Sequence, residues 1–251
     1  MMSYSFFAGF YDTLTENVEY SARAKYFCSL LSDYGVNGGL LLDLACGTGS
    51  LSVELAKNGF SVIGIDSSEE MLSVAQNKKF SSGVDVMFLC QDMRSLDLYG
   101  TVNCCVSALD SLNHLTSEED LLKAFQNVSL FTEDRGIFIF DMNTLYKHRN
   151  TLADNSFIYD CGDVFCAWQN SLRDDGYTVD ITLDFFEEQS DGAYERFTES
   201  FSEKAYSPET VKELLEKADF TLLAEYDELT REKPDGNSQR TVFVARRNSR
   251  K

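Results

Sequence analysis

The stretch that decides the fold is LLLDLACGTGS, from Leu40 to Ser50. An apolar run typical of a β-strand leads into a turn with Gly47 and Gly49, and helical spacing follows directly. Glycines in such a turn adopt dihedral angles that other residues resist and let a ligand approach the backbone closely. Two glycines alone are weak evidence for a particular ligand, so the ligand has to be inferred from the neighbouring segments.

On both sides of this turn, short apolar segments alternate with helical patterns, which is typical of βαβ units in a parallel sheet covered on both faces. An amphipathic helix is predicted over residues 19–34, before the first strand. The motifs Ser67-x-x-Glu70 and Thr116-x-x-Glu119 predict the starts of two later helices as capping boxes. The strands that we predict are 39–45, 60–66, 84–90, 101–108 and 136–142.

After the fifth strand the pattern changes. Residues 178–185 alternate polar and apolar side chains, as a strand with one buried face does. Asp175-Gly176 and Asp191-Gly192 are hairpin turn signals on either side of it, so residues 155–206 are predicted to be an antiparallel insertion. Ser207-Pro208 then predicts a helix start. The chain is expected to end in an antiparallel hairpin with strands at about 220–229 and 239–246.

Composition excludes several classes of protein. With 22 basic and 41 acidic residues the net charge is −19, which disfavours a binder of nucleic acid or of anionic membranes. No apolar run approaches the roughly 18 to 20 residues that span a bilayer, and the N-terminus does not resemble a signal peptide. The seven cysteines form no CxxC pair or metal-binding spacing. We therefore expect no metal, and a soluble cytoplasmic protein with reduced thiols.

Acidic residues stand near the ends of the first three strands. A nicotinamide or flavin site would favour G-x-G-x-x-G, whereas here Ser52 takes the third position and Asp43 precedes the turn. A carboxylate there would repel a pyrophosphate but suits a ligand with an ammonium group. Asp66 can accept hydrogen bonds from ribose hydroxyls, and Asp92 from an adenine amino group.

The segments DLACGTGS, GIDSSEEML and CQDMRSL resemble the first three cofactor motifs of class I S-adenosylmethionine-dependent methyltransferases. The resemblance implies a Rossmann-like seven-stranded mixed sheet with helices on both faces and an antiparallel insertion after the fifth strand. Residues 1–154 and 207–251 would form the cofactor-binding core, and residues 155–206 a lid over the acceptor site. It also implies that S-adenosyl-L-methionine is the cofactor and S-adenosyl-L-homocysteine the product.

By this resemblance, the turn after the first strand holds the methionine end of the cofactor, Asp66 the ribose, Met71 one adenine face, and Asp92 with Met93 the adenine edge. The cofactor-binding residues expected in all are Tyr11, Tyr20, Asp43, Ala45, Gly47, Gly49, Asp66, Ser67, Met71, Gln91, Asp92, Met93 and Leu109.

Within the family, the chain is most similar to bacterial amino-sugar N-methyltransferases and more distantly to glycine N-methyltransferase. Two short motifs carry this comparison, Phe10-Tyr11-Asp12 and the segment from Ala108 to Leu115. His114 is expected to act as the base that deprotonates an amine, since a protonated amine has no lone pair with which to attack. Tyr11 is expected either beside the sulfonium or hydrogen-bonded to an acceptor amine. Asn113 with Asp110 is expected to orient the acceptor, although packing and turn chemistry explain these residue types too.

Other residues have simpler interpretations. We expect His148 at the surface, and Cys46 not to be a nucleophile. The basic tail is expected to be a solvated terminus. Aromatic residues of the insertion either line the acceptor pocket or form its core, and they are Trp168, Phe185, Phe186 and Tyr194.

The sequence thus predicts methyl transfer to a small polar acceptor, with an amine nitrogen favoured, in a monomer or homodimer. Four alternatives stay open: O-methylation of a small metabolite, methylation of a macromolecule, a regulatory protein that binds the cofactor without turnover, and a dinucleotide-dependent oxidoreductase.

Overall fold

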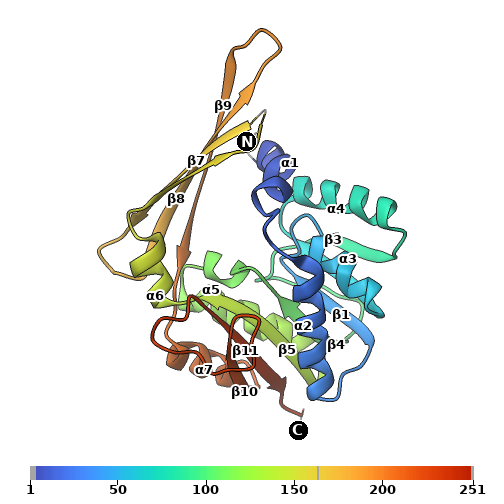
Figure 1. Cartoon of the computed structure of the whole chain (residues 1–251). Helices are drawn as coiled ribbons and strands as arrows, with labels where there is room; N and C mark the ends of the chain where they lie inside the picture. Colours follow the sequence, from blue (N-terminus) through green and yellow to red (C-terminus); the bar gives the residue numbers. More distant parts are fainter. Residues whose placement is uncertain (1–3, 163, 250–251) are drawn as a thin grey trace.

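The computed structural model describes residues 4–162 and 164–249 and has two sheets (Figure 1). The larger one has seven strands in the order β10-β11-β5-β4-β1-β2-β3. Neighbours from β5 to β3 run parallel, whereas β11 is antiparallel to both β5 and β10. The mixed seven-stranded sheet is therefore confirmed. Its strands are β1 (Gly39–Leu44), β2 (Phe60–Asp66), β3 (Val86–Cys90), β4 (Val102–Ser107), β5 (Thr132–Asn143), β10 (Phe220–Asp227) and β11 (Arg240–Arg247).

Helices cover both faces of this sheet. On one face, α5 and α7 pack on side chains such as Leu42, Phe138 and Phe140. On the other face, α2 and α3 pack on Leu41 and Ile137. Alternate residues of β1 and β5 thus enter opposite cores, as the pleat of a strand requires. The helices are α1 (Tyr4–Leu14), α2 (Tyr20–Asp33), α3 (Ser50–Lys57), α4 (Glu69–Ser82), α5 (Glu118–Phe131), α6 (Leu145–Lys147) and α7 (Pro208–Lys217), with the short turns η1 (Ser111–His114) and η2 (His148–Leu152).

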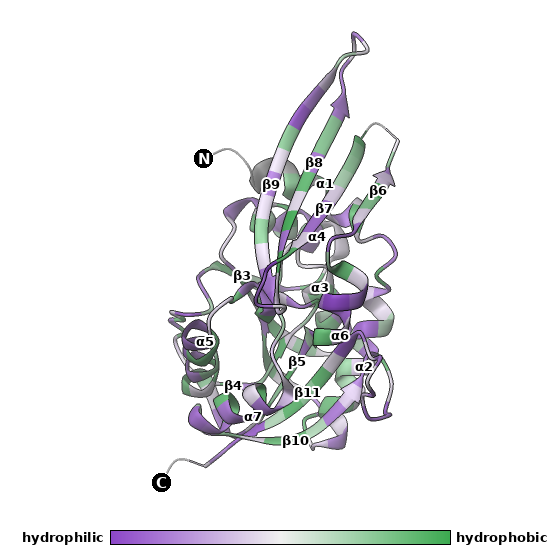
Figure 2. Cartoon of the chain, turned by 90° about the vertical axis from the view of Figure 1, so that its left-hand side faces the viewer, coloured by the Kyte–Doolittle hydropathy of each residue, from purple (hydrophilic) through white to green (hydrophobic). Residues whose placement is uncertain are grey.

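The second sheet, called here the insertion sheet, projects away from the first (Figures 1 and 2). It is antiparallel, in the order β6-β7-β8-β9. Its small core packs against Phe7, Phe10 and Leu14 of α1, so the N-terminal helix lies between the two sheets. Its strands are β6 (Ser156–Asp160), β7 (Val164–Leu172), β8 (Thr178–Glu188) and β9 (Tyr194–Lys204).

Three sequence expectations need correction. The N-caps of α4 and α5 are Ser68 and Ser117, one residue later than the capping boxes predicted, because both sites hold two consecutive residues able to cap. The tail is not wholly solvated: Arg247 is buried and bonds to Ser129 O and Asp134. The basic residues at 250 and 251 lie outside the described part of the chain.

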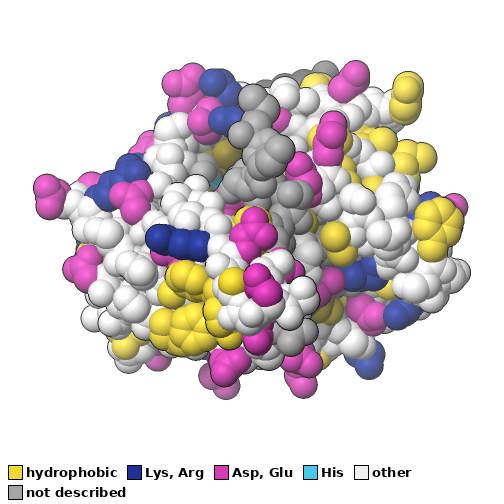
Figure 3. Space-filling view, turned by 90° about the horizontal axis from the view of Figure 1, so that it is seen from above, with side chains coloured by type: hydrophobic (Ala, Val, Ile, Leu, Met, Phe, Trp, Pro, Cys, Tyr) yellow, Lys and Arg dark blue, Asp and Glu magenta, His cyan; other side chains and the backbone are white. Residues whose placement is uncertain are grey.

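No helix in the described part of the chain is long and apolar enough to cross a membrane. Seen from above, acidic side chains are spread over the visible face, and Lys and Arg form no extended patch there (Figure 3).

Candidate active site

The turn after β1 has a backbone conformation that favours glycine. Ala45, Gly47 and Gly49 have φ of 60°, 54° and 73°, so β1 ends at Leu44 and the backbone turns sharply into α3. A Cβ on Gly49 would lie 2.7 Å from Cζ of Phe88, so this glycine lets α3 approach β3. A Cβ on Gly47 would meet no atom within 4 Å, which leaves open space above the turn.

Asp66 fastens this turn to the end of β2. Its carboxylate accepts hydrogen bonds from the backbone N–H of Gly47 at 2.8 Å and of Ser68 at 2.9 Å. Burial raises the pKa of Asp66, and the backbone N–H groups oppose that rise. Asp66 therefore positions the glycine turn and the start of α4 while lining the main cavity.

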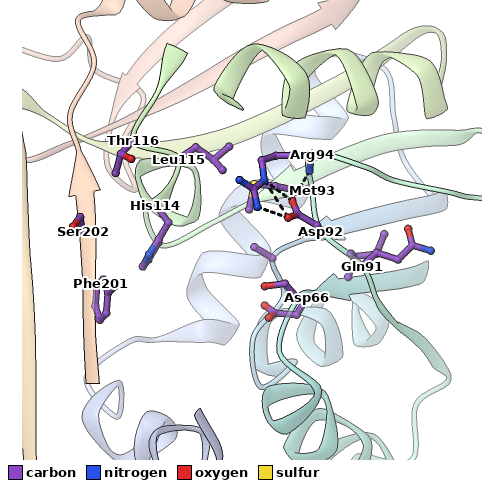
Figure 4. Close-up of a pocket in the computed structure, with 13 residues that line it drawn as sticks. Asp66, Gln91, Asp92, Met93, Arg94, His114, Leu115, Thr116, Phe201 and Ser202 are labelled. Atoms are coloured by element: carbon purple, nitrogen blue, oxygen red, sulfur yellow. Dashed lines mark hydrogen bonds and ion pairs between the residues drawn. The ribbon is translucent and has the colours of Figure 1, made fainter. Parts of the chain in front are cut away.

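That cavity is called the main cavity because it lies at the carboxyl ends of the parallel strands, the usual ligand site of an open α/β sheet. Its volume is about 440 Å³, and a larger hollow of about 690 Å³ lies beside β2, β3 and α4. Figure 4 shows His114 and Phe201 on one side of it and Asp66, Gln91 and Asp92 on the other. Its remaining walls are Ala45, Ile65, Ser67, Met93, Arg94, Leu115, Thr116 and Ser202.

A smaller hollow of about 30 Å³ shares Ala45 with the main cavity. Asp43 lies in its wall with only 1% of its surface exposed and accepts a hydrogen bond from Ser52 Oγ at 2.5 Å. Burial raises the pKa of Asp43 to about 7; the Ser52 hydroxyl opposes the shift, and the Asp66 charge adds to it. A buried carboxyl without a cationic partner among the described residues fits a ligand that brings a positive charge. Tyr11, Tyr20, Gly47 and Leu109 also line this hollow.

The N-terminal helix is fastened over the hollow by a polar cluster. Asp12 on α1 accepts a hydrogen bond from Thr48 Oγ1 at 2.6 Å and pairs with Lys78 Nζ at 2.7 Å. Lys78 also bonds to Ser50 Oγ at 2.5 Å, so α1, the glycine turn and α4 are joined at one point. This cluster places Tyr11 beside the turn.

At the end of β3, the side chains of Gln91 and Asp92 already have partners. The Gln91 amide exchanges two hydrogen bonds with the backbone of Asp97 and so shapes the loop. Arg94 binds Asp92 through Nε and Nη2 (Figure 4). It also pairs with Asp120 on α5 at 3.3 Å. The Arg94 hydrogen bonds lower the pKa of Asp92, and this carboxylate stays ionised while lining the cavity.

His114 ends the η1 turn and faces the same cavity, with 46% of its side chain exposed. Its ring lies 5.0 Å from the ring of Phe201, and its Nε2 is 3.8 Å from Glu203 Oε1. Loss of hydration inside the cavity lowers the pKa of His114, against the charges of Asp110 and Asp66. At neutral pH the ring is therefore a neutral base.

Under the hollow runs a buried ionic network. The two carboxylate oxygens of Asp141 accept from the backbone N–H groups of Leu109 and Asp110, residues with φ of 57° and 54°. Arg240 pairs with Asp141 at 2.7 Å and Asp110 at 2.8 Å. Burial opposes ionisation of Asp110, but Arg240 and Lys147 prevail and lower its pKa. This network holds the strained turn that carries η1.

Met71 and Asn113, both predicted for the site, do not line the main cavity or the smaller hollow. Neither do the four aromatic residues of the insertion that the sequence singled out. Asn113 is fully buried, and its amide bonds to Asn143 and to Lys204 O. Met71 is 7% exposed in the first turn of α4. Of the aromatic residues in the insertion, Phe185 packs on α1 and Tyr194 is 59% exposed, whereas the insertion sheet lines the cavity with Phe201 and Ser202.

The expectation that His148 lies at the surface is wrong. Its side chain is fully buried, with Nδ1 2.9 Å from Tyr177 O and Nε2 3.9 Å from Glu203 Oε2. A lone histidine after a strand gives no sign of the insertion that covers it. Glu203 and Arg240 were missed for a similar reason, because their partners lie roughly 55 to 130 residues away along the chain.

Comparisons with known proteins agree with this geometry. Residues 41–136 match the family model described as "Methyltransferase domain". A protein of Geobacillus sp. (strain WCH70) that is named "Putative methyltransferase GWCH70_2453" is 33% identical over 98% of this chain and 100% of its own length. The crystal structure of an S-adenosylmethionine-dependent methyltransferase from Clostridium acetobutylicum ATCC 824 has a TM-score of 0.87 and 32% identity, covering 98% of this chain and 99% of its own.

A solved sugar N-methyltransferase, KedS8 from Streptoalloteichus sp. ATCC 53650, has a TM-score of 0.77 over 95% of this chain and 93% of its own. At 16% identity this likeness concerns the fold alone.

A glycine turn, three strand-end acids and a matching fold define a cofactor-binding enzyme of the Rossmann-like class. The chain belongs to the class I S-adenosylmethionine-dependent methyltransferases. Its residues fit the cofactor: Asp43 is a buried acid in a hollow that Gly47 also lines, and this hollow shares Ala45 with the cavity that Asp66 and Asp92 line.

Proposed function

We propose that this methyltransferase acts on an amine nitrogen of a small polar molecule. The observation that carries the proposal is the position of His114, a neutral imidazole on the wall of the cavity that Asp66 and Asp92 also line. Among the described residues neither ring nitrogen of His114 is within hydrogen-bonding distance of a partner, so the ring is free to take a proton. A base is needed for an ammonium acceptor, since its nitrogen has no lone pair until a proton leaves.

The charges around His114 support a cationic acceptor. Asp110 is ionised within its turn, and the Glu203 carboxyl lies 3.8 Å from Nε2 of the ring. Phe201 adds an aromatic surface that suits a cation. An acceptor that arrives as an ammonium ion would therefore be attracted to the base that deprotonates it.

We assign cofactor binding to residues that line the main cavity and the smaller hollow. We propose that Asp43 binds the ammonium of the methionine end, with Ala45, Gly47, Gly49 and Leu109 forming its floor. Asp66 would bind the ribose beside Ser67. When bound, S-adenosylmethionine supplies an electrophilic methyl group on a sulfonium. At the adenine end, Gln91, Asp92 and Met93 would form the edge of the site, with Met71 behind it.

Tyr11 and Tyr20 would close the methionine end from above. Burial raises the pKa of Tyr11 well above its ordinary value, so its hydroxyl keeps its proton. Asn113 would act indirectly, because its amide ties η1 to β5 and β9 and so fixes the direction of His114. Holding the acceptor nitrogen in line with the methyl group would contribute most of the rate.

We further propose that residues 1–154 and 207–251 are the cofactor-binding core and residues 155–206 the lid. The contact of Phe201 and Ser202 with the main cavity supports this division, since both belong to the insertion sheet.

The test is a panel of matched amines and alcohols with wild type and His114→Ala, analysed by mass spectrometry of the product. We expect methylation of amines, and a loss of about a hundredfold in His114→Ala between pH 6 and 8. Activity of His114→Ala within a few-fold of wild type would contradict the role as base. Methylation of the alcohols alone would contradict the amine acceptor.

A further inference from the structure

Glu203 is a buried carboxyl that pairs with no Lys or Arg side chain among the described residues. Its side chain is 6% exposed, on the last strand of the insertion sheet. Nearby cations have other partners: Arg240 pairs with Asp110, Asp141 and Glu228, and Lys147 donates to Asn143 Oδ1. In the described part of the chain, the groups within ion-pair distance of Glu203 are two histidines.

The ring of His148 presents a nitrogen without a hydrogen to the Glu203 carboxyl. Its Nδ1 lies 2.9 Å from Tyr177 O, and a carbonyl can only accept, so Nδ1 carries the hydrogen. The other nitrogen of the neutral ring, Nε2, is then an acceptor, buried and without a hydrogen-bond partner in the described chain. Glu203 Oε2 faces it at 3.9 Å, within ion-pair distance but beyond the length of a hydrogen bond.

The other carboxyl oxygen faces the proposed base. Glu203 Oε1 is 3.8 Å from Nε2 of His114, whose ring lies in the main cavity. Asn143 Nδ2 donates to Oε2 at 3.1 Å and holds the carboxyl in place between the two rings. One carboxyl therefore joins a solvent-accessible imidazole to a buried one.

We propose that Glu203 is a positioning residue that receives, through the ring of His114, the proton that leaves the acceptor amine. This inference rests on the proposed amine acceptor. The step starts from ionised Glu203, the form that is populated as pH rises through about 8. The ammonium nitrogen gives its proton to Nδ1 of His114, and Nε2 of His114, once it closes the 3.8 Å gap to Oε1, gives its own proton to the Glu203 carboxylate. On the His114 ring, an N–H bond forms at Nδ1 and the N–H bond at Nε2 breaks, so the ring is neutral after the transfer. The amine keeps its electron pair for attack, and Glu203 later returns the proton to solvent.

The charged groups around the cluster favour this direction of transfer. Burial and the Asp110 charge raise the pKa of Glu203 to about 8, against Lys147 on α6 and Arg240 on β11. The pKa of His114 is instead lowered, and so is that of His148, mainly by burial. A proton taken up by His114 is therefore more stable on Glu203.

The first experiment needs no acceptor. Infrared difference spectra of the protein with bound S-adenosylhomocysteine are recorded between pH 6 and 10, for wild type, Glu203→Gln and Glu199→Gln. Glu199 is a buried carboxyl on the same face of the same strand, which makes it a matched control. We expect a protonated-carboxyl band that disappears near pH 8 in wild type and Glu199→Gln and is missing in Glu203→Gln. A carboxylate that is ionised throughout would overturn the inference.

The second experiment compares pH profiles of kcat/KM with an amine that wild type methylates. We expect the Glu203→Gln rate to be at least about tenfold lower at pH 8, without the step near pH 8 that wild type and Glu199→Gln show. Titration of the amine itself is common to all three proteins and does not obscure the difference. Retained binding of S-adenosylhomocysteine shows that each variant is folded.

The two proposals fail in different ways. If wild type methylates no amine, the proposed function fails. If amines are methylated but Glu203→Gln keeps the wild-type profile, the proton path through Glu203 is wrong and the amine acceptor stands.

Discussion

Replacement of Asp43 by asparagine should remove the pH dependence of cofactor binding. Asp43 is almost completely buried, with a pKa raised to about 7 in the free protein, and its carboxyl lies in the hollow beside Gly47. A ligand ammonium placed there favours the ionised form and returns the pKa toward its ordinary range. Binding therefore releases a proton wherever Asp43 is protonated in the free protein.

The magnitude follows from linkage. With a free pKa of about 7 and a bound pKa of about 4, the Kd of S-adenosylhomocysteine rises about fivefold from pH 7 to 6, and nearly tenfold more from pH 6 to 5. The proton release at pH 6 is about 0.9 per site by the same relation. Each further pH unit below the free pKa costs about 1.4 kcal/mol of binding free energy.

Isothermal titration in buffers of different ionisation enthalpy measures both quantities. Asp43→Asn has nearly the same shape and no proton to release, so its Kd should vary little between pH 5 and 7. Asp12→Asn is the control, since it removes a nearby carboxylate that already pairs with Lys78. A wild-type Kd that is independent of pH, or an equal slope in Asp43→Asn, would refute the reasoning.

Three further changes test the structure. Asp66→Ala removes the acceptor of two backbone N–H groups and should weaken S-adenosylhomocysteine binding by about a hundredfold in the same titration. Arg240→Met removes the cation that pairs with Asp110 and leaves Arg23 as the remaining ion-pair partner of Asp141 among the described residues. It should cost about 3–5 kcal/mol in urea unfolding, against less than about 1 kcal/mol for the exposed Arg231→Met; equal costs would contradict the network. Because the pKa of Glu203 is raised on folding, its stabilisation is complete at low pH and is lost as pH rises through about 8. Wild type should therefore lose about 3 kcal/mol between pH 6 and 9 that Glu203→Gln keeps, measured by unfolding at both values.

Local patterns were sufficient for the sheet and for the placement of the residues proposed to bind the cofactor. The strand 60–66 has the predicted bounds, and the alternation over 178–185 lies within β8. Asp43, the glycine turn, Asp66 and Asp92 are all within about 50 residues, and each directly follows or ends a strand of one parallel sheet. The carboxyl ends of such strands meet at one edge, so sequence order alone brings these residues together.

The acceptor half depends on contacts that no local pattern encodes. Glu203 lies 89 positions beyond His114, in a strand whose alternation is the same whether a carboxyl faces water or a histidine. His148 is buried because β7 and β8 of the insertion sheet close over η2.

By itself, then, the sequence determined the class of fold, the cofactor and the position of the acids proposed to bind it, because these depend on strand periodicity and short-range turn chemistry. Only the tertiary structure decided that one buried carboxyl lies between two imidazoles and that Arg240 neutralises the acids under the site. The physical reason is burial: the protonation state of a group depends on which distant residues exclude water from it and which charges they bring.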